Sequence, residues 1–194
     1  MQQAGFLVGG EPLTALDLVD TVILTVDPPL DLIGEPEKAA AWWGFEEPRL
    51  PAGPRPEIGA TRRLRAAIRD LLDAQIEDRA PSADAVADVN AFAAAVPTSR
   101  QLVITPDGVE ATVRWHTEQG GNPVLAAIAV EAIELLADPE ERAKLRRCAN
   151  PACSMLFLAR TRRRVWCTDA ICGNRARAAR HYQRSRASKR GGTG

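Results

Sequence analysis

The chain has 194 residues, of which 45% are hydrophobic and 26% are charged. A chain of this length can bury one hydrophobic core together with a small satellite module. Its apolar runs are too short to span a bilayer, and its first residues lack the basic segment of a secretory signal. These features argue against an integral membrane protein, and we expect a cytoplasmic protein that does not bind membranes.

The formal net charge of zero hides a separation of the two signs along the chain. Residues 142–194 hold fifteen Lys and Arg and one acidic residue, which is a net charge of +14. Residues 1–141 hold ten Lys and Arg and twenty-four Asp and Glu, which is a net charge of −14. This asymmetry indicates a C-terminal part that binds a polyanion and an acidic body with another task. The alternative is that the acidic body attracts the basic part within the same molecule, and both can hold.

The pattern of residues 1–138 predicts a mainly helical domain. A short strand is expected at residues 6–8. Apolar residues then recur at helical spacing in five segments, at residues 12–24, 37–45, 58–79, 85–95 and 124–136. Residues 101–116 alternate about the turn Pro106-Asp107-Gly108, which predicts a β-hairpin. The expected fold class is mainly α (α+β), and residues 1–138 are expected to fold without the remainder.

A second unit is expected at residues 139–190, followed by a disordered tail at residues 191–194. Asp138 is a candidate helix cap, and Pro139 suits the first position of that helix. We expect this helix to run directly into Cys148, so that the second unit is attached stiffly.

All four cysteines lie in this second unit, as Cys148-x4-Cys153 and Cys167-x4-Cys172. Two cysteine pairs that each close a tight turn are the ligand pattern of a structural tetrahedral Zn²⁺. The alternatives are two disulfides or four ordinary buried thiols. Nothing in the sequence directs the chain to an oxidising compartment, and the clustering of all four cysteines argues against scattered core thiols. We therefore expect one zinc ion bound by all four thiolates. Its coordination shell would be closed, so the zinc would stabilise the fold and carry no catalytic water.

The segments around the cysteines predict a small zinc finger. Residues 155–158 and 165–166 are candidate strands of a hairpin, joined by the arginine-rich loop 160–164. Thr168 is a candidate N-cap for a helix that ends near Ser185. A knuckle, a hairpin and a helix that carries the last ligands form a treble-clef-like module.

The residues Cys172-Gly173-Asn174-Arg175 resemble the CGNR zinc finger, and Trp166-Cys167 and Cys148-Ala149-Asn150-Pro151-x-Cys153 fit the same family. That finger usually follows a mostly helical region called the ABATE domain. The opening motif of that domain resembles Leu16-Asp17-Leu18-Val19-Asp20-Thr21, although Asp20 stands where Asn is more usual. The resemblance implies a bacterial, stress-induced transcription regulator that binds DNA.

The candidate nucleic-acid contacts fall in two sets. The loop holds Arg160, Arg162, Arg163 and Arg164, and one face of the helix holds Arg177, Arg180 and Arg184. The guanidinium group suits both phosphate oxygens and the guanine edge, and a helix fits the DNA major groove. DNA is favoured over RNA because the finger lacks a row of exposed aromatic side chains for stacking on bases. Asn174 and Arg175, next to Cys172, are expected to have a structural role in the finger. Ile171, Ala178 and Tyr182 are expected to face the hairpin.

These observations predict a zinc-binding, DNA-binding transcription regulator whose acidic body senses a ligand, dimerises or contacts a partner. The alternative is a protein–protein adaptor whose basic finger docks an acidic partner or its own body. A small-molecule effector site in the body would draw on Asp17, Asp20, Trp43, Arg65, Arg69, Trp115 and His116. We expect no enzymatic activity, because the sequence offers no nucleophile–base pair, phosphate loop or second metal cluster.

Overall fold

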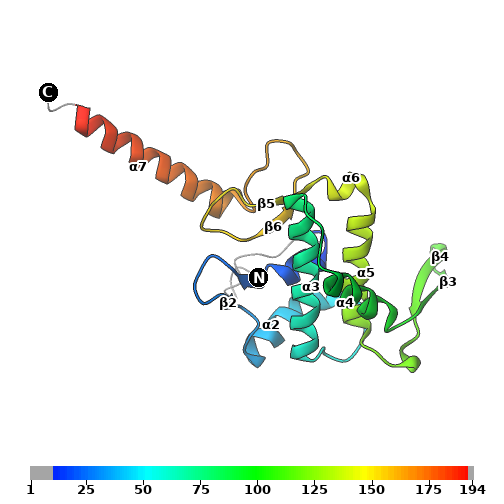
Figure 1. Cartoon of the computed structure of the whole chain (residues 1–194). Helices are drawn as coiled ribbons and strands as arrows, with labels where there is room; N and C mark the ends of the chain where they lie inside the picture. Colours follow the sequence, from blue (N-terminus) through cyan, green and yellow to red (C-terminus); the bar gives the residue numbers. More distant parts are fainter. Residues whose placement is uncertain (1–10, 192–194) are drawn as a thin grey trace.

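A computed structural model describes residues 11–191 (Figure 1), with side chains described up to Tyr182 and at Arg184. The strand expected at residues 6–8 and the tail residues 192–194 lie outside this range. The elements in chain order are α1 (Thr14–Val19), β1 (Val22–Ile23), β2 (Leu30–Asp31), α2 (Pro36–Glu46), η2 (Glu47–Arg49), α3 (Ile58–Glu77), α4 (Ala83–Ala94), β3 (Thr98–Thr105), β4 (Gly108–Trp115), η3 (Thr117–Gln119), α5 (Pro123–Ala137), α6 (Pro139–Arg142), β5 (Leu145–Arg147), β6 (Leu156–Leu158), η4 (Asp169–Gly173) and α7 (Asn174–Gly191). None of the helices within residues 11–191 is both long and apolar enough to cross a membrane.

The body is a helical bundle in which α1, α3 and α5 contact one another and α4 packs on α3 and α5. Its core is built from the apolar face of each helix, and Leu16, Leu64, Ile68 and Ile128 are fully buried there. Trp42 of α2 is 1% exposed and closes one side of this core. The predicted helices α2, α3, α4 and α5 are confirmed, and their side chains have the burial that helical spacing implies.

The first predicted helix is wrong beyond Val19. Helix α1 ends there because the Thr21 hydroxyl donates to the Leu18 carbonyl at 2.6 Å, and the chain then turns into the short β1–β2 pair. The turn carries Asp20, which is 1% exposed, toward the C-terminal part of the molecule. An apolar periodicity cannot distinguish a longer helix from this turn, because residues 22 and 23 are half-buried in either case.

The predicted β-hairpin is confirmed as β3–β4, two antiparallel strands of eight residues each. Its register runs from Thr98 opposite Trp115 to Thr105 opposite Gly108, so Pro106 and Asp107 form the turn. The hairpin projects from the body, on the side of the molecule opposite to α7 (Figure 1).

The connection to the C-terminal part differs from the prediction in two respects. Helix α6 ends at Arg142, and a strand, β5, rather than a helix leads into Cys148. Strand β6 pairs with β5, so that Leu145 lies opposite Leu158, and residues 165–166 form no strand. The physical reason is burial, because this pairing lets Leu145, Leu156 and Leu158 join the core of the body.

The body and the C-terminal part therefore share one hydrophobic core. Leu156 is 1% exposed and Leu158 is 5% exposed, and both belong to the same cluster as Leu16 and Ile68. The expectation that residues 1–138 fold alone stays a prediction. The shared core indicates that such a fragment would lose part of its own packing.

A buried group of carboxylates lies where α1, α2 and α5 meet. Glu46 is fully buried, and its Oε2 accepts a hydrogen bond from the Thr14 hydroxyl at 3.3 Å. Arg49 Nη1 lies 3.2 Å from Glu46 and 2.8 Å from Asp17, so one guanidinium group serves two acids. Burial and the nearby Asp17 raise the pKa of Glu46 from its ordinary 4.5 to about 7.

This shifted pKa makes the stability of the fold depend on pH. Because the folded protein keeps a proton on Glu46 that the unfolded chain has lost, this stabilisation is complete below pH 4.5 and is lost as pH rises through 7. Glu46→Gln stays neutral, so we expect it to be more stable than the parent at pH 8 by up to about 3 kcal/mol and nearly equal at pH 5. Urea unfolding at both pH values measures the difference. An equal difference at the two pH values would contradict this explanation.

Candidate metal centre

The first cysteine pair lies in a knuckle between β5 and β6. The Cys148 amide donates to the Met155 carbonyl at 2.9 Å, and the Cys153 amide donates to the Asn150 carbonyl at 2.9 Å. The Asn150 side chain also accepts from the Ala152 amide at 3.1 Å, which closes the turn at Asn150-Pro151. These bonds hold the two sulfurs on the inner side of the knuckle.

The second cysteine pair lies at the entrance to the C-terminal helix. The Thr168 hydroxyl accepts from the Ile171 amide at 3.2 Å, which confirms the predicted N-cap. The first turn, η4, is a π-helical turn that presents Cys172 before α7 begins at Asn174. The Thr168 carbonyl accepts from both the Cys172 and Gly173 amides at 3.1 Å, which fixes this turn.

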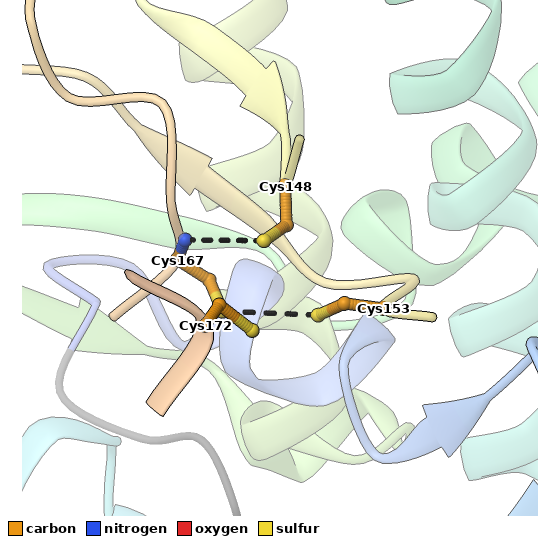
Figure 2. A group of neighbouring side chains, drawn as sticks. All are labelled: Cys148, Cys153, Cys167 and Cys172. Carbon is orange, nitrogen blue, oxygen red and sulfur yellow. Dashed lines mark hydrogen bonds between the residues drawn. The ribbon is translucent and has the colours of Figure 1, made fainter. Parts of the chain in front are cut away.

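Figure 2 shows the four cysteine side chains directed toward one another. All four sulfurs lie within 4.8 Å of one another, and the Cys153–Cys167 and Cys167–Cys172 sulfur distances are 3.8 and 3.6 Å. A tetrahedral zinc site with bonds of about 2.3 Å requires sulfur separations of about 3.8 Å. A disulfide requires about 2.05 Å, and all four thiols are free. The arrangement therefore fits one zinc ion and excludes the disulfide alternative for this conformation.

The surroundings favour the metal-binding thiolate form at Cys153, whereas burial raises the pKa of the Cys148 thiol. The Cys167 amide donates to Cys148 Sγ at 3.5 Å, and Asn150 Nδ2 donates to Cys172 Sγ at 3.6 Å. The hydrogen bond from Cys167 lowers the pKa of the Cys153 thiol to about 5, and the same pairing raises the pKa of Cys167. Zinc displaces the remaining protons and closes the shell, so that its role is to hold the knuckle and η4 together.

Hydrogen bonds from the body fix the knuckle in place. Both carboxylate oxygens of Asp20 accept from the Leu156 amide, at 3.0 and 3.1 Å. Arg69 Nη2 donates to the Ser154 carbonyl at 2.9 Å, and the Ser154 hydroxyl accepts from the Leu24 amide at 3.0 Å. Burial raises the pKa of Asp20 well above its usual value, although the Leu156 bond and Arg69 oppose this shift. Asp20 thus provides the hydrogen-bond acceptor for the buried Leu156 amide of β6.

This role predicts different effects on stability for two substitutions at position 20. Asp20→Ala leaves the buried Leu156 amide without an acceptor, so we expect a loss of about 2–3 kcal/mol of unfolding free energy. Asp20→Asn keeps an acceptor oxygen and removes the cost of burying a charge, so its stability should stay within about 1 kcal/mol of the parent. Denaturant unfolding of the zinc-loaded chain at neutral pH makes the comparison. Equal destabilisation by Asn and Ala would contradict the proposed role.

The residues after Cys172 brace the start of α7. A Cβ at position 173 would meet the Asp169 carboxylate, so a larger residue there would displace this exposed side chain from its pairing with Arg177. Asn174 Nδ2 donates to the Ala170 carbonyl at 2.8 Å, and Arg177 Nη1 donates to Asp169 at 2.9 Å. Arg175 is exposed and lines a small cavity of about 50 Å³ beside the cysteines.

The structure places the loop arginines in two different environments. Arg160, Arg162 and Arg163 are exposed, and no hydrogen bond or ion pair joins them to another described residue. Arg164 is half-buried, donates to the Leu158 and Cys167 carbonyls at 3.0 and 2.7 Å, and pairs with Glu11 at 2.7 Å. Its guanidinium also lies 4.4 Å from the centre of the Phe157 ring. The predicted phosphate contact at Arg164 is therefore corrected, because this side chain is a brace inside the finger.

A basic groove that sequence reasoning missed lies between β5 and the loop. Its volume is about 580 Å³, and its cationic lining residues are Lys144, Arg146, Arg147, Arg160, Arg162 and Arg164. Residues 144–147 were expected to belong to a connecting helix, so their position beside the loop could not be foreseen. Arg147 is also paired with Asp73 and Glu77 of α3, at 2.8 and 2.7 Å, and so links the finger to the body.

Helix α7 contacts η4 at its start and then projects away from the body (Figure 1). Arg177, Arg180 and Arg184 are exposed, and Arg177 also pairs with Asp169. Ala178 is exposed and Tyr182 is 62% exposed, so the prediction that they face the hairpin is wrong. They are exposed because β6, the strand they were expected to cover, is buried against the body instead.

The body residues that could have formed one effector site do not converge. Asp17 pairs with Arg49, Asp20 and Arg69 meet the knuckle, and Arg65 binds Asp31 and Thr21. Trp43 lines a cavity beside Pro51, Trp115 lies at the base of the hairpin, and His116 forms a hydrogen bond with Ser99. Two of these residues, Asp20 and Arg69, were missed as supports of the metal centre, as was Ser154 in the knuckle itself, and all three act through tertiary contacts.

Residues 14–139 match the ABATE family model, which is described as "putative stress-induced transcription regulator". Residues 144–185 match the model of the CGNR zinc finger. No curated protein matches the chain. The finger match covers the four clustered sulfurs, so zinc is the metal that this centre binds. The chain therefore belongs to the ABATE family and carries a C-terminal CGNR zinc finger.

Proposed function

We propose that this protein is a DNA-binding transcription regulator whose finger contacts the duplex through α7 and the loop 160–164. The observation that carries the proposal is the set of exposed arginines without acidic neighbours. In the described part of the finger, Asp169 is the acidic residue, and it is already paired with Arg177. The remaining cations are therefore available to phosphate groups.

Helix α7 has the properties of a helix that is stabilised when it binds a polyanion. It has 18 residues, so it is about 27 Å long. Its described side chains are exposed nearly all round, and like charges at neighbouring helical positions destabilise such a helix. Phosphate groups would relieve that repulsion, and the B-DNA major groove is wide enough to admit the helix.

The basic groove supports a second contact with the nucleic-acid backbone. Arg160 and Arg162 lie along it with the exposed side chain of Arg146. A groove lined by cations from β5 and from the loop suits binding to phosphates, which position a protein on DNA without reading its sequence. We assign backbone contacts to this groove and to Arg163, and base reading to Arg180 or Arg184.

The adaptor alternative is favoured less by the contacts inside the molecule. The acidic body pairs with the finger at Arg147 and Arg164, which are braces. No ion pair joins Arg180 or Arg184 to the described residues of the body, so these groups are not used for internal docking. In this proposal the protein acts in the cytoplasm without enzymatic chemistry, and the acidic body receives the regulatory signal.

Fluorescence anisotropy with a labelled random-sequence duplex tests the proposal. We expect the zinc-loaded chain to bind the duplex and to lose this binding when a strong chelator removes the metal. Poly-glutamate stands in for the acidic protein partner that the adaptor alternative requires. Retention of the chain by poly-glutamate, together with no binding to the duplex, would support the adaptor instead.

A further inference from the structure

The projecting β3–β4 hairpin has one apolar face and one polar face. In its register, Leu102 lies opposite Ala111 and Ile104 lies opposite Val109, so these four side chains share a face. The other face carries Gln101, Val103, Thr105, Glu110, Thr112 and Arg114. A hairpin exposed to water on both sides has no need for such a division.

The apolar face is uncovered by the described residues. Ile104 is 91% exposed, Leu102 is 77% exposed and Val109 is 65% exposed. A two-stranded ribbon is only marginally stable on its own, and exposed apolar strands are otherwise avoided. An element with eight residues in each strand therefore requires a surface that covers this face.

A groove of about 510 Å³ continues this face at the base of the hairpin. Its lining includes Val113 and Trp115 of β4, and Ala127 and Val130 of α5. Arg100 lies at the same place, opposite Val113 and on the apolar face. The apolar face of the hairpin thus continues at its base into a groove whose lining is partly apolar and partly charged, with Arg49, Glu131 and Glu134 among the charged residues.

We propose that β3–β4 is a dimerisation arm that packs face to face, in antiparallel orientation, with the arm of a second copy. A two-fold axis would place the tip of each hairpin in the groove of the other, so that every contact is made twice. The same operation brings Asp107, at the tip, to Arg100 at the base of the opposite arm. A second copy of the chain therefore supplies both the apolar side chains that cover this face and the opposite charge for Arg100 and Asp107.

The area agrees with a specific dimer. The exposed side chains Leu102, Ile104, Val109 and Val113, at roughly 100 Å² each, supply about half of the ~800 Å² per partner that a standard interface buries. The half-buried Ala127 and Val130 in the groove and the polar groups around it add to this area. The arm lies on the side of the body away from α7 (Figure 1), so both fingers of the dimer stay accessible. The inference stands whether or not the fingers bind DNA.

Sedimentation velocity of the zinc-loaded full chain tests the inference at roughly 1–100 μM. We expect the parent to be a dimer and Leu102→Ser/Ile104→Ser to weaken association at least ~100-fold. Because both side chains are exposed in the single chain, the variant should keep its zinc and its far-UV circular dichroism spectrum. Val103→Ser, the same kind of change on the polar face, is the matched control and should stay dimeric.

Charge exchange tests the antiparallel arrangement. Asp107→Arg and Arg100→Asp should each weaken the dimer, and the double variant should recover most of the association. A parent that is monomeric throughout the range would overturn the inference. So would a dimer that survives Leu102→Ser/Ile104→Ser, or a double variant that fails to recover.

Discussion

Cys167→Ser is expected to release the zinc and to lower the unfolding temperature of the whole chain. Zinc binding contributes on the order of 10 kcal/mol to the folding of small modules, so the knuckle and η4 should separate without it. The strands β5 and β6 then lose their anchor at Cys148. Since Leu145, Leu156 and Leu158 belong to the core of the body, we expect the body to lose at least about 3 kcal/mol.

For a chain of this size, this loss corresponds to a fall in unfolding temperature of roughly 6–12 °C. Calorimetry, together with metal analysis of the same sample, measures both effects. Thr161→Ala, in the exposed loop, is the control and should keep the metal and the transition. Full zinc content in Cys167→Ser would contradict ligation by all four sulfurs, and a body transition at the temperature of the parent would show that the finger and the body are independent.

Arg180→Glu/Arg184→Glu is expected to weaken duplex binding roughly 100-fold at about 0.1 M salt. These two side chains are exposed on the projecting part of α7, and each substitution replaces a cation that we propose to contact DNA with an anion that phosphates repel. The zinc content and the unfolding transition should not change. Anisotropy titrations with a random-sequence duplex measure the affinity.

The matched control for this pair carries the same charge change on the body, as Arg55→Glu/Arg114→Glu. Both side chains are exposed, and both lie outside the finger. If the control weakens binding as much as the α7 pair, net charge alone would account for the affinity. Sensitivity confined to α7 would instead locate the contact on the finger.

The metal centre could be predicted from the sequence because its determinants are local. Each cysteine pair closes one turn, and Asn150-Pro151 and Thr168 fix those turns with bonds to residues only a few positions away. The long helices α3 and α5 were predictable for a similar reason, since their apolar faces repeat over many turns.

The pairing of β6 was not predictable, because strand pairing depends on which partner buries the apolar side chains. The sequence indicated a strand at residues 165–166 and a helix at residues 145–147, but the core of the body selects residues 145–147 as the partner of β6. The role of Asp20 was not predictable for the same reason, because its carboxylate accepts a hydrogen bond from the Leu156 amide, which is 136 residues away in the sequence. Arg164 looked like its exposed neighbours until the fold placed it against Phe157. Tertiary burial, absent from the local pattern, decided each of these cases.

DNA recognition by the finger is tested most directly by the salt dependence of duplex binding by the zinc-loaded chain. With backbone contacts from the exposed residues Arg146, Arg160, Arg162 and Arg163 and from one of Arg180 and Arg184, log K should fall against log salt with a slope of about −4 to −5. Arg162→Ala should lower the magnitude of that slope by about one, and Arg164→Ala should instead reduce stability. A slope near zero, or a slope that removal of the loop arginines leaves unchanged, would contradict DNA binding by this surface.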